Sequence, residues 1–265
     1  HQIVSYDPRN GIDDIPEADV AFPVLHGMGG EDGSIQVALE RANIPYVGSD
    51  PAASSLCFDK WAYKQKIQKA GLPTPEAMLV TKGTVWQSHI TKHPFVLKPI
   101  SGGSSIDTFI IRDLANMDKS ALENSLIAHT EMLLEELIEG IELTVGILGN
   151  QALPAVEITP PTNGEFDYEN KYNGKTQEIC PPLHVSSAVH KKAQELALEA
   201  HLLVNCRDIS RTDIIATPAG RLMVLETNTM PGMTDQSLYP KAAAANGLVM
   251  ADLVDRLVQA ALARA

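Results

Sequence analysis

Acidic and basic side chains recur at regular spacing in two neighbouring segments near the end of the chain, ISRTDII and RLMVLETN. Both segments read as strands. Because side chains alternate between the two faces of a strand, Arg211 and Asp213 share one face of the first segment, and Glu226 and Asn228 share one face of the second. Carboxylate and amide oxygens suit Mg²⁺ or Mn²⁺ bound together with substrate phosphates. The two segments therefore indicate metal-assisted phosphate chemistry.

A hairpin would bring these side chains together. If it closes at the Pro218-Ala219-Gly220 turn, Asp213 lies opposite Glu226, and Arg211 lies opposite Asn228. Two close carboxylates repel one another unless a cation sits between them. The alternative is a solvated hairpin face with an Arg–Glu cross-strand pair, because exposed charge is common on proteins.

Three further segments could contribute to such a site. The loop SGGSS follows Lys98, and its N–H groups and hydroxyls could cradle phosphate. Because it lacks the lysine of the P-loop pattern, the alternative is that it is only a flexible connection between two strands. Gly232 could offer a backbone N–H to an oxyanion, or it is a plain turn glycine. His26 opens the loop HGMGGEDG, where α/β proteins bind ligands, or it is a structural histidine. That loop does not complete the dinucleotide pattern GxGxxG, because residue 32 is Asp.

The elements that must position these residues follow from periodicity and from breaker residues. An apolar run over 19–25 and a helix over 34–42, with Ser34 as its N-cap, form one βα unit. Asp59 caps a second helix that ends before Gly71. Further strands are expected at 95–98, 108–111, 132–137, 142–148 and 151–158, and further helices at 187–204 and after 248. The proline-rich stretch 160–182 is expected to be a long loop, and loops of that length are usually functional or disordered.

Composition sets limits on the function. The chain has 265 residues, 21 Lys and Arg against 33 Asp and Glu, and a formal charge of −12. An acidic protein lacks the clustered positive charge that nucleic-acid backbones require, although a few local lysines can still bind a nucleotide. No apolar run approaches the roughly 18–20 residues of a membrane span. Three scattered cysteines form neither a disulfide framework nor a zinc motif, which suits a reducing compartment.

Taken together, these segments resemble a D-alanine–D-alanine ligase of the ATP-grasp superfamily. The resemblance runs over nearly the whole chain from Phe22 onward, and the order and spacing of its motifs make it specific. The most specific stretches are FPVLHGMGGEDG (22–33), YVGSD (46–50), DK (59–60), LKPISGGSS (97–105), ELTV (142–145), YENKY (168–172) and RTD…LETNTMPGMTDQSLYP (211–240).

The resemblance implies a place for each part of ATP. Lys60 and Lys98 would contact its phosphates, Ser104 and Ser105 would belong to the loop that closes over them, and Glu142 would bind the ribose. The adenine would lie against a hinge between two lobes, formed by Glu135, Glu136, Leu137 and Ile138. Two Mg²⁺ or Mn²⁺ ions would be bound by Asp213, Glu226 and Asn228.

It also implies roles around the amino-acid substrates. Arg211 and the Gly232 N–H would stabilise an oxyanion, and Ser237 and Leu238 would hold the carboxylate of the second amino acid. His26 would lie near the substrates. A mobile loop covering the site would carry Lys171 and Tyr172.

The implied reaction joins two D-alanine molecules for peptidoglycan precursors. A carboxylate is a poor electrophile, so ATP would first convert one D-alanine into an acyl phosphate, while metal ions and lysines neutralise the transferring phosphoryl group. The amine of the second D-alanine would then attack, and the tetrahedral intermediate would need preplaced oxyanion donors. ADP and phosphate would be released.

The implied fold is the three-domain ATP-grasp fold, a mixed α/β (α+β) arrangement in which two lobes grip ATP. The N-terminal substrate domain would span 1–48, the central lobe with the phosphate-binding loop 49–134, and the C-terminal lobe with the metal and substrate sites 135–265. The family suggests a cytoplasmic homodimer whose ligands are D-alanine and ATP, with no nucleic-acid or membrane partner.

Three departures from the family pattern matter. The family begins with a strand and a loop whose Glu orients the first substrate, so we expect several dozen residues to be missing before His1. The phosphate loop has Gly102 and Asp107 where an acidic residue and a glycine are common, and the hinge has Glu136 where a lysine is frequent. Two alternatives stay open, a D-alanine–D-lactate or other carboxylate–amine ligase, and a nucleotide-binding homologue without catalysis. The Lys171-Tyr172 pair favours the dipeptide enzyme.

Overall fold

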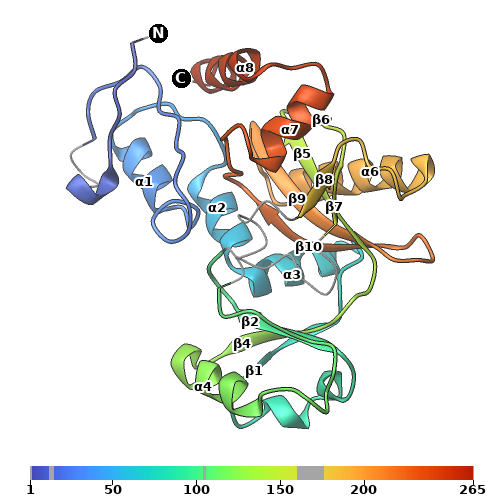
Figure 1. Ribbon diagram of the computed structural model, residues 1–265. Coiled ribbons are helices and arrows are strands. Elements are labelled where there is room, and N and C mark those ends of the chain that lie inside the picture. The colour runs from blue at the N-terminus through green and yellow to red at the C-terminus, as the bar shows by residue number, and fades with distance from the viewer. Residues whose placement is uncertain (1, 12–14, 104–105, 160–175, 265) are drawn as a thin grey trace.

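The computed structural model describes residues 2–11, 15–103, 106–159 and 176–264, and every structural statement below concerns these residues. Two antiparallel sheets lie one above the other and are joined along one side of the molecule (Figure 1). The first sheet has the order β1-β4-β2-β3. Its strands are β1 (Ala77–Val80), β2 (Phe95–Pro99), β3 (Phe109–Ile111) and β4 (Met132–Glu136). The second has the order β10-β9-β5-β7-β8, with β6 paired to β5. Its strands are β5 (Ile141–Leu148), β6 (Gln151–Ala152), β7 (Val156–Thr159), β8 (Gln177–Ile179), β9 (Ile209–Ala216) and β10 (Leu222–Asn228).

Among the described residues, helices cover one face of the first sheet. Phe95 and Leu97 on β2 share a buried core with Leu122 and Leu126 of α4 (Lys119–His129). Two short 3₁₀ helices, η2 (Val85–Gln87) and η3 (Ile90–Lys92), close the rest of that core. Because strand residues alternate, the residues next to Phe95 and Leu97 on β2 point to the opposite face of this sheet.

Both faces of the second sheet carry helices. One face shares a core with three helices, α2 (Pro51–Phe58), α3 (Lys60–Lys69) and α6 (Ser187–Leu203). The other face packs at one end against α7 (Leu238–Ala245) and α8 (Met250–Leu262). Helices α2 and α3 thus precede the first sheet in the chain but pack on the second, against β10. None of the helices in the described part of the chain is long and apolar enough to cross a membrane.

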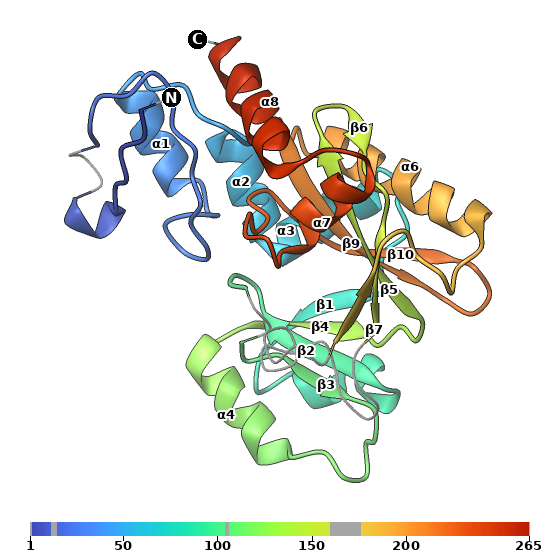
Figure 2. The ribbon, with the colours of Figure 1, turned by 45° about the horizontal axis from the view of Figure 1, so that its top comes forward.

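The N-terminal part contains less regular structure than the sequence predicted. It contains a 3₁₀ turn, η1 (Pro8–Asn10), and helix α1 (Ser34–Arg41), and α2 lies between α1 and the second sheet (Figure 2). The apolar run 19–25, expected to be the strand of a βα unit, forms only a single parallel bridge between Ala21 and Tyr46. Pro23 has no N–H to extend the pairing. Ser34 is also not the cap of α1, because Gly33 holds the N-cap position.

Most other predicted elements are confirmed. Asp59 caps α3 by accepting a hydrogen bond from the Ala62 N–H at 2.9 Å, as expected. The predicted strand 151–158 is two strands, β6 and β7, and Pro154 lies between them. Helices α2, α4 and α7 and strands β1 and β8 were not predicted.

The predicted hairpin is present, with one irregularity that changes the site. Asp213 is opposite Glu226 and Arg211 is opposite Asn228, as predicted. Nearer the turn the register differs by one residue, and a β-bulge between Val224 and Glu226 makes up the difference. Two residues of β10 therefore oppose one residue of β9 at the bulge.

Gly146 on β5 allows an aromatic ring to lie directly on the second sheet. A Cβ atom on Gly146 would lie 2.9 Å from two ring carbons of Tyr239 and 3.1 Å from Leu153 Cδ1. The Tyr239 hydroxyl donates to the Ile147 carbonyl at 2.8 Å and is buried. The ring on α7 thus needs a glycine beneath it.

We expect Gly146→Ala to lower the free energy of unfolding by about 1–3 kcal/mol, because the added methyl forces the Tyr239 ring off the strand. Gly83→Ala is the matched control, since a Cβ there would meet only Thr81 Oγ1 at an ordinary 3.7 Å. Urea denaturation of both variants is the measurement. Equal stability of the two variants would contradict the packing role of Gly146.

His201 gives the fold a pH dependence. It is buried on α6, and its Nδ1 lies 2.7 Å from Ser210 Oγ on β9. Burial lowers the pKa of His201 from 6.5 to about 4, although Asp208 opposes this shift. The unfolded chain therefore binds more protons than the folded chain between these two pH values, so stability falls as the pH drops through this window.

We expect the free energy of unfolding to fall by about 2–3 kcal/mol as the pH is lowered from 7 to 4 through the titration of this residue. His201→Gln keeps a polar partner for Ser210 but cannot titrate, so its stability should decline less steeply over the same range. Denaturant melts at several pH values compare the two chains, and parallel pH profiles would rule out His201 as the source.

Candidate active site

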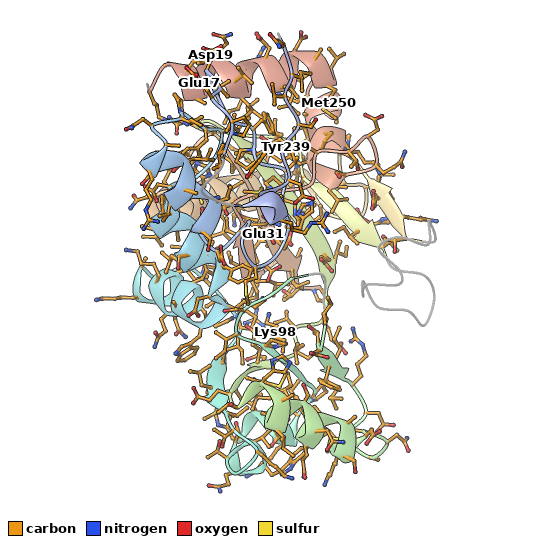
Figure 3. All side chains as sticks on the ribbon, turned by 90° about the vertical axis from the view of Figure 1, so that its left-hand side faces the viewer. Glu17, Asp19, Glu31, Lys98, Tyr239 and Met250 are labelled. Carbon is orange, nitrogen blue, oxygen red and sulfur yellow. The ribbon has the colours of Figure 1, made fainter. Side chains whose placement is uncertain are left out.

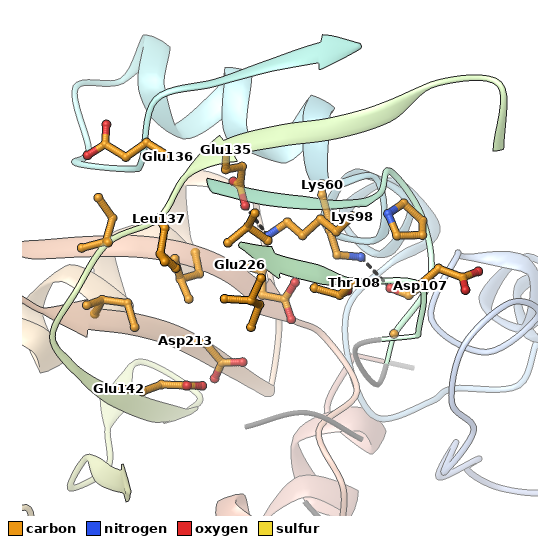
Figure 4. A pocket seen from close by; sticks show the side chains of 18 of the residues that line it. Lys60, Lys98, Asp107, Thr108, Glu135, Glu136, Leu137, Glu142, Asp213 and Glu226 are labelled. Carbon is orange, nitrogen blue, oxygen red and sulfur yellow. Dashed lines mark hydrogen bonds and ion pairs between the residues drawn. The ribbon is translucent and has the colours of Figure 1, made fainter. Parts of the chain in front are cut away.

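A pocket of about 520 Å³ lies between the two sheets. Pockets for small ligands commonly have volumes of roughly 300–1,000 Å³. Figure 4 shows Lys60 and Lys98 on one side of it and Glu142, Asp213 and Glu226 on the other. The pocket therefore has a basic wall and an acidic wall.

The basic wall comes from the uncovered face of the first sheet and from α3. Phe95 and Leu97 of β2 point into the core, so Val96 and Lys98 point into the pocket. Lys60 is the first residue of α3, and its Nζ donates to the Gly102 carbonyl at 2.6 Å. This contact brings Lys60 to the loop that follows β2.

Glu135 of β4 lies behind this wall and is buried, with 2% of its surface exposed. One carboxylate oxygen is 2.5 Å from Lys98 Nζ, and the other is 2.5 Å from Lys64 Nζ on α3. Burial alone would raise the pKa of Glu135, but the Lys98 and Lys64 ammoniums outweigh it and lower the pKa. Burial would also lower the pKa of Lys98, yet Glu135 and Glu226 raise it. Glu135 therefore stays anionic and Lys98 cationic.

Lys60 has a different balance of charges. Burial lowers its pKa and nearby Lys98 lowers it further, while Glu226 and Glu135 act in the opposite direction without overcoming burial. Two neighbouring ammonium groups in a partly dry pocket form a site for an anion with more than one negative charge.

The acidic wall is one face of the second sheet. Glu142 on β5, Asp213 on β9 and Glu226 on β10 all line the pocket. The bulge adds Leu225 to the same surface, so an apolar side chain and an acidic one that are neighbours in sequence both reach the pocket. In a regular strand, Leu225 and Glu226 would point to opposite faces.

Asp213 already has partners within the sheet. Arg211 donates to its two carboxylate oxygens at 3.0 Å and 2.9 Å, and the Thr144 hydroxyl donates to one of them. Burial alone would lower the pKa of Arg211, but Asp213 and Glu226 outweigh burial and raise it. Asn228 is opposite Arg211, and its Oδ1 accepts from the Met230 N–H at 2.7 Å. Neither Arg211 nor Asn228 lines the pocket.

The hinge predicted at residues 135–138 crosses one end of the pocket. Leu137 and Ile138 line the pocket, as does the exposed Glu136. The backbone is fixed there, because the Glu136 N–H donates to the Glu76 carbonyl at 2.9 Å and the Leu137 N–H donates to the Pro94 carbonyl at 3.1 Å. The side chain of Glu135 faces the two lysines, so its contribution is to the basic wall.

The predicted substrate residues lie outside this pocket. Gly232 and Ser237 are neighbours, since a Cβ on Gly232 would lie 2.7 Å from Ser237 Oγ, and Leu238 begins α7. His26 is exposed and does not line the pocket. Four predicted residues, Ser104, Ser105, Lys171 and Tyr172, lie outside the described residues.

Three residues near the site were not predicted. Lys64 follows Lys60 by four residues, a spacing that places both on one side of α3 and could have indicated it. Leu225 reaches the pocket through the bulge, which has no signature in the sequence. Glu31 accepts from the Gly27 N–H at 2.6 Å and approaches Gly103, and burial raises its pKa. Figure 3 shows Glu31 between the part of the molecule that holds Tyr239 and the sheet that holds Lys98.

The two walls define what the pocket can bind. The lysines suit phosphate groups, and the three carboxylates opposite them suit a hard divalent cation that those phosphates also bind. Apolar side chains at the hinge end, among them Leu137, Ile138 and Leu225, suit a flat apolar group. A nucleoside triphosphate with its cation has this distribution of chemistry.

Known proteins share both the sequence and the fold. Residues 67–259 match the family model described as D-ala D-ala ligase C-terminus, and residues 3–49 match D-ala D-ala ligase N-terminus. A D-alanine--D-alanine ligase from Oleidesulfovibrio alaskensis is 41% identical, over 99% of this chain and 87% of the relative. One from Xanthobacter autotrophicus is 40% identical, over 91% of this chain and 80% of the relative.

Solved structures give the same result. D-alanine--D-alanine ligase from Bacillus anthracis superposes with a TM-score of 0.84 at 31% identity, covering 97% of this chain and 84% of the other. The same protein complexed with ATP gives a TM-score of 0.78 at 30% identity, covering 97% of this chain and 83% of the other. The mixed helix-and-sheet architecture is thus the ATP-grasp fold. With a family model matched over most of its length and relatives about 40% identical, this chain belongs to the D-alanine–D-alanine ligase family.

Proposed function

We propose that this protein joins two D-alanine molecules into D-alanyl-D-alanine, with ATP converted to ADP and phosphate, and so supplies a peptidoglycan precursor. The observation that carries the proposal is the pocket in which Lys60 and Lys98 face three carboxylates. Relatives of the same family bear this activity in their names, and one solved relative is complexed with ATP.

ATP would lie between the sheets. Its phosphates would contact Lys60 and Lys98, with Ser104 and Ser105 in the loop that closes over them. Its ribose would bind Glu142. Its adenine would rest at the hinge end of the pocket, against Glu136, Leu137 and Ile138, with Glu135 behind them.

The donor set fits a hard divalent cation. Asp213 and Glu226 lie opposite one another and both line the pocket, so their carboxylates repel one another unless a cation lies between them, and oxygen ligands suit Mg²⁺ or Mn²⁺. We propose that Asp213, Glu226 and Asn228 hold two such ions. Asp213 would then bind an ion as well as accept from Arg211, and Asn228 Oδ1 would bind an ion as well as accept from the Met230 N–H. When bound, the ions would neutralise charge on the transferring phosphoryl group.

The protein's own groups would then act on the substrates. Lys60 and Lys98 would hold the γ-phosphate while the carboxylate of the first D-alanine attacks it, which breaks the bond to the β-phosphate, releases ADP as the leaving group and produces an acyl phosphate. The neutral amine of the second D-alanine would attack the acyl carbon, Arg211 and the Gly232 N–H would stabilise the oxyanion, and the tetrahedral intermediate would collapse to the dipeptide with phosphate as the leaving group. Ser237 and Leu238 would hold the carboxylate of the second D-alanine.

Two further roles concern the surroundings of the acyl phosphate. Lys171 and Tyr172 would cover the site and exclude water, because acyl phosphates hydrolyse. His26 would lie near the substrates. It is exposed, and it lowers the pKa of the neighbouring Glu31 carboxyl, although burial of that carboxyl has the larger, opposite effect.

We further propose that the chain divides into a substrate domain (1–48), a central lobe (49–134) and a C-terminal lobe (135–265). Two features cross these boundaries: α2 and α3 pack on the sheet of the C-terminal lobe, and β4 extends to residue 136. We also propose that the assembled enzyme is a cytoplasmic homodimer, as the resemblance to the family suggests.

Incubation of the purified protein with ATP, Mg²⁺ and D-alanine should release ADP only when D-alanine is present, and mass spectrometry should find the dipeptide. A parallel reaction with D-alanine plus D-lactate should yield the same dipeptide as main product. A depsipeptide as main product would identify a D-alanine–D-lactate ligase. ADP release that ignores D-alanine would refute the ligase activity.

Glu226→Gln should reduce D-alanine-dependent phosphate release by about 100-fold or more, because an amide removes a charge from the proposed metal site while keeping its shape. Glu195→Gln is the control, because Glu195 is an exposed α6 residue paired with Lys191. Both variants should melt at the wild-type temperature. Wild-type turnover by Glu226→Gln would remove Glu226 from the metal site.

A further inference from the structure

Lys64 is a buried lysine that the proposed mechanism does not use. Only 1% of its surface is exposed, and it lies on α3. The preceding residue, Tyr63, forms a hydrogen bond of 2.6 Å through its hydroxyl with Thr227 Oγ1 of β10. Its ammonium group has three acceptors, the Glu135 carboxylate at 2.5 Å, Thr74 Oγ1 at 2.7 Å and the Pro75 carbonyl at 3.2 Å. A buried charge is expensive unless it is paired in this way.

The charge count explains why a second lysine is needed. Glu135 has one negative charge and contacts two ammonium groups, so the three groups together carry one net positive charge. Without Lys64, the charge of Lys98 would be fully balanced by Glu135. Lys98 would then attract a phosphate less strongly.

Lys64 also links the two sheets. It belongs to a helix packed on the second sheet, while Glu135 and Lys98 belong to the first sheet. The pair therefore sets the position of the basic wall relative to the acidic wall, in addition to its charge.

We propose that Lys64 is a positioning residue for nucleotide binding, which balances part of the negative charge of Glu135 so that the charge of Lys98 can act on the phosphates in the pocket. The inference rests on the proposed nucleotide site between the sheets. It does not depend on which amino acids the enzyme joins.

The test is ADP binding, measured by titration calorimetry with Mg²⁺ present. Lys64→Met keeps the length of the side chain and removes its charge, and its dissociation constant for ADP should rise about tenfold. Lys66→Met is the control on the same helix, because Lys66 is exposed, and its affinity should stay at the wild-type value. In steady-state assays Lys64→Met should raise KM for ATP by a similar factor, with kcat within about threefold of wild type.

A double-variant comparison separates positioning from folding. If Lys64 acts through Glu135, adding Lys64→Met to Glu135→Gln should change the ADP dissociation constant by less than about twofold. The same tenfold loss in both backgrounds, or no loss in the single variant, would overturn the proposal. Lys64→Gln, which keeps a hydrogen-bond donor, replaces Lys64→Met throughout if the latter does not fold.

Because calorimetry measures ADP binding without the reaction, it tests the role of Lys64 separately from the proposed ligase activity. If the wild type binds ADP but joins no D-alanine, the proposed reaction fails while the comparison of variants still decides the role of Lys64. If the wild type binds no ADP, the nucleotide site itself is wrong and the role of Lys64 falls with it.

Discussion

The carboxylate of Glu135 lies where both sheets and the pocket meet, and it is buried between two ammonium groups, Lys98 and Lys64. Leaving such a buried ion without one of its partners costs about 3–5 kcal/mol. The fold must therefore bring α3 and β4 together at this point, and it can do so only if the two sheets pack with one particular alignment. The position of Lys98, and with it the basic side of the pocket, depends on that contact.

Because side chains alternate along a strand, the same strands supply residues to the core and residues to the walls of the pocket. On β2, Leu97 fills the core under α4 while Lys98 enters the pocket. On β9, Ile214 packs against α6 while Asp213 faces the ligand side. A shift of either strand by one residue would bury the charge and expose the apolar side chain, so the energetics of the core also keep the chemistry in place.

The sequence predicted those parts of the site whose geometry is set by interactions between residues close together in the chain. The alternation in the last two strands placed Asp213 opposite Glu226, and Asp59 marked the start of α3. The sequence could not reveal the bulge at Leu225, because the extra residue depends on how β10 pairs with β9. It also could not identify the partners of Lys64, since Glu135 is 71 residues away and the contact depends on how the two sheets pack together.

Two crossings of the chain connect the sheets, residues 70–76 and residues 137–140, and they run side by side because the Glu136 N–H bonds the Glu76 carbonyl. Such a pair of crossings can act as a hinge axis, and Lys64 contacts one of them through Thr74 and Pro75. A rotation of one lobe about this axis would displace atoms in proportion to their distance from it. The Lys64–Glu135 contact would hardly move, whereas the loop at Gly102, beyond the far end of β2, would move through a larger arc, so the pocket could open for exchange of nucleotide without breaking the buried ion pair.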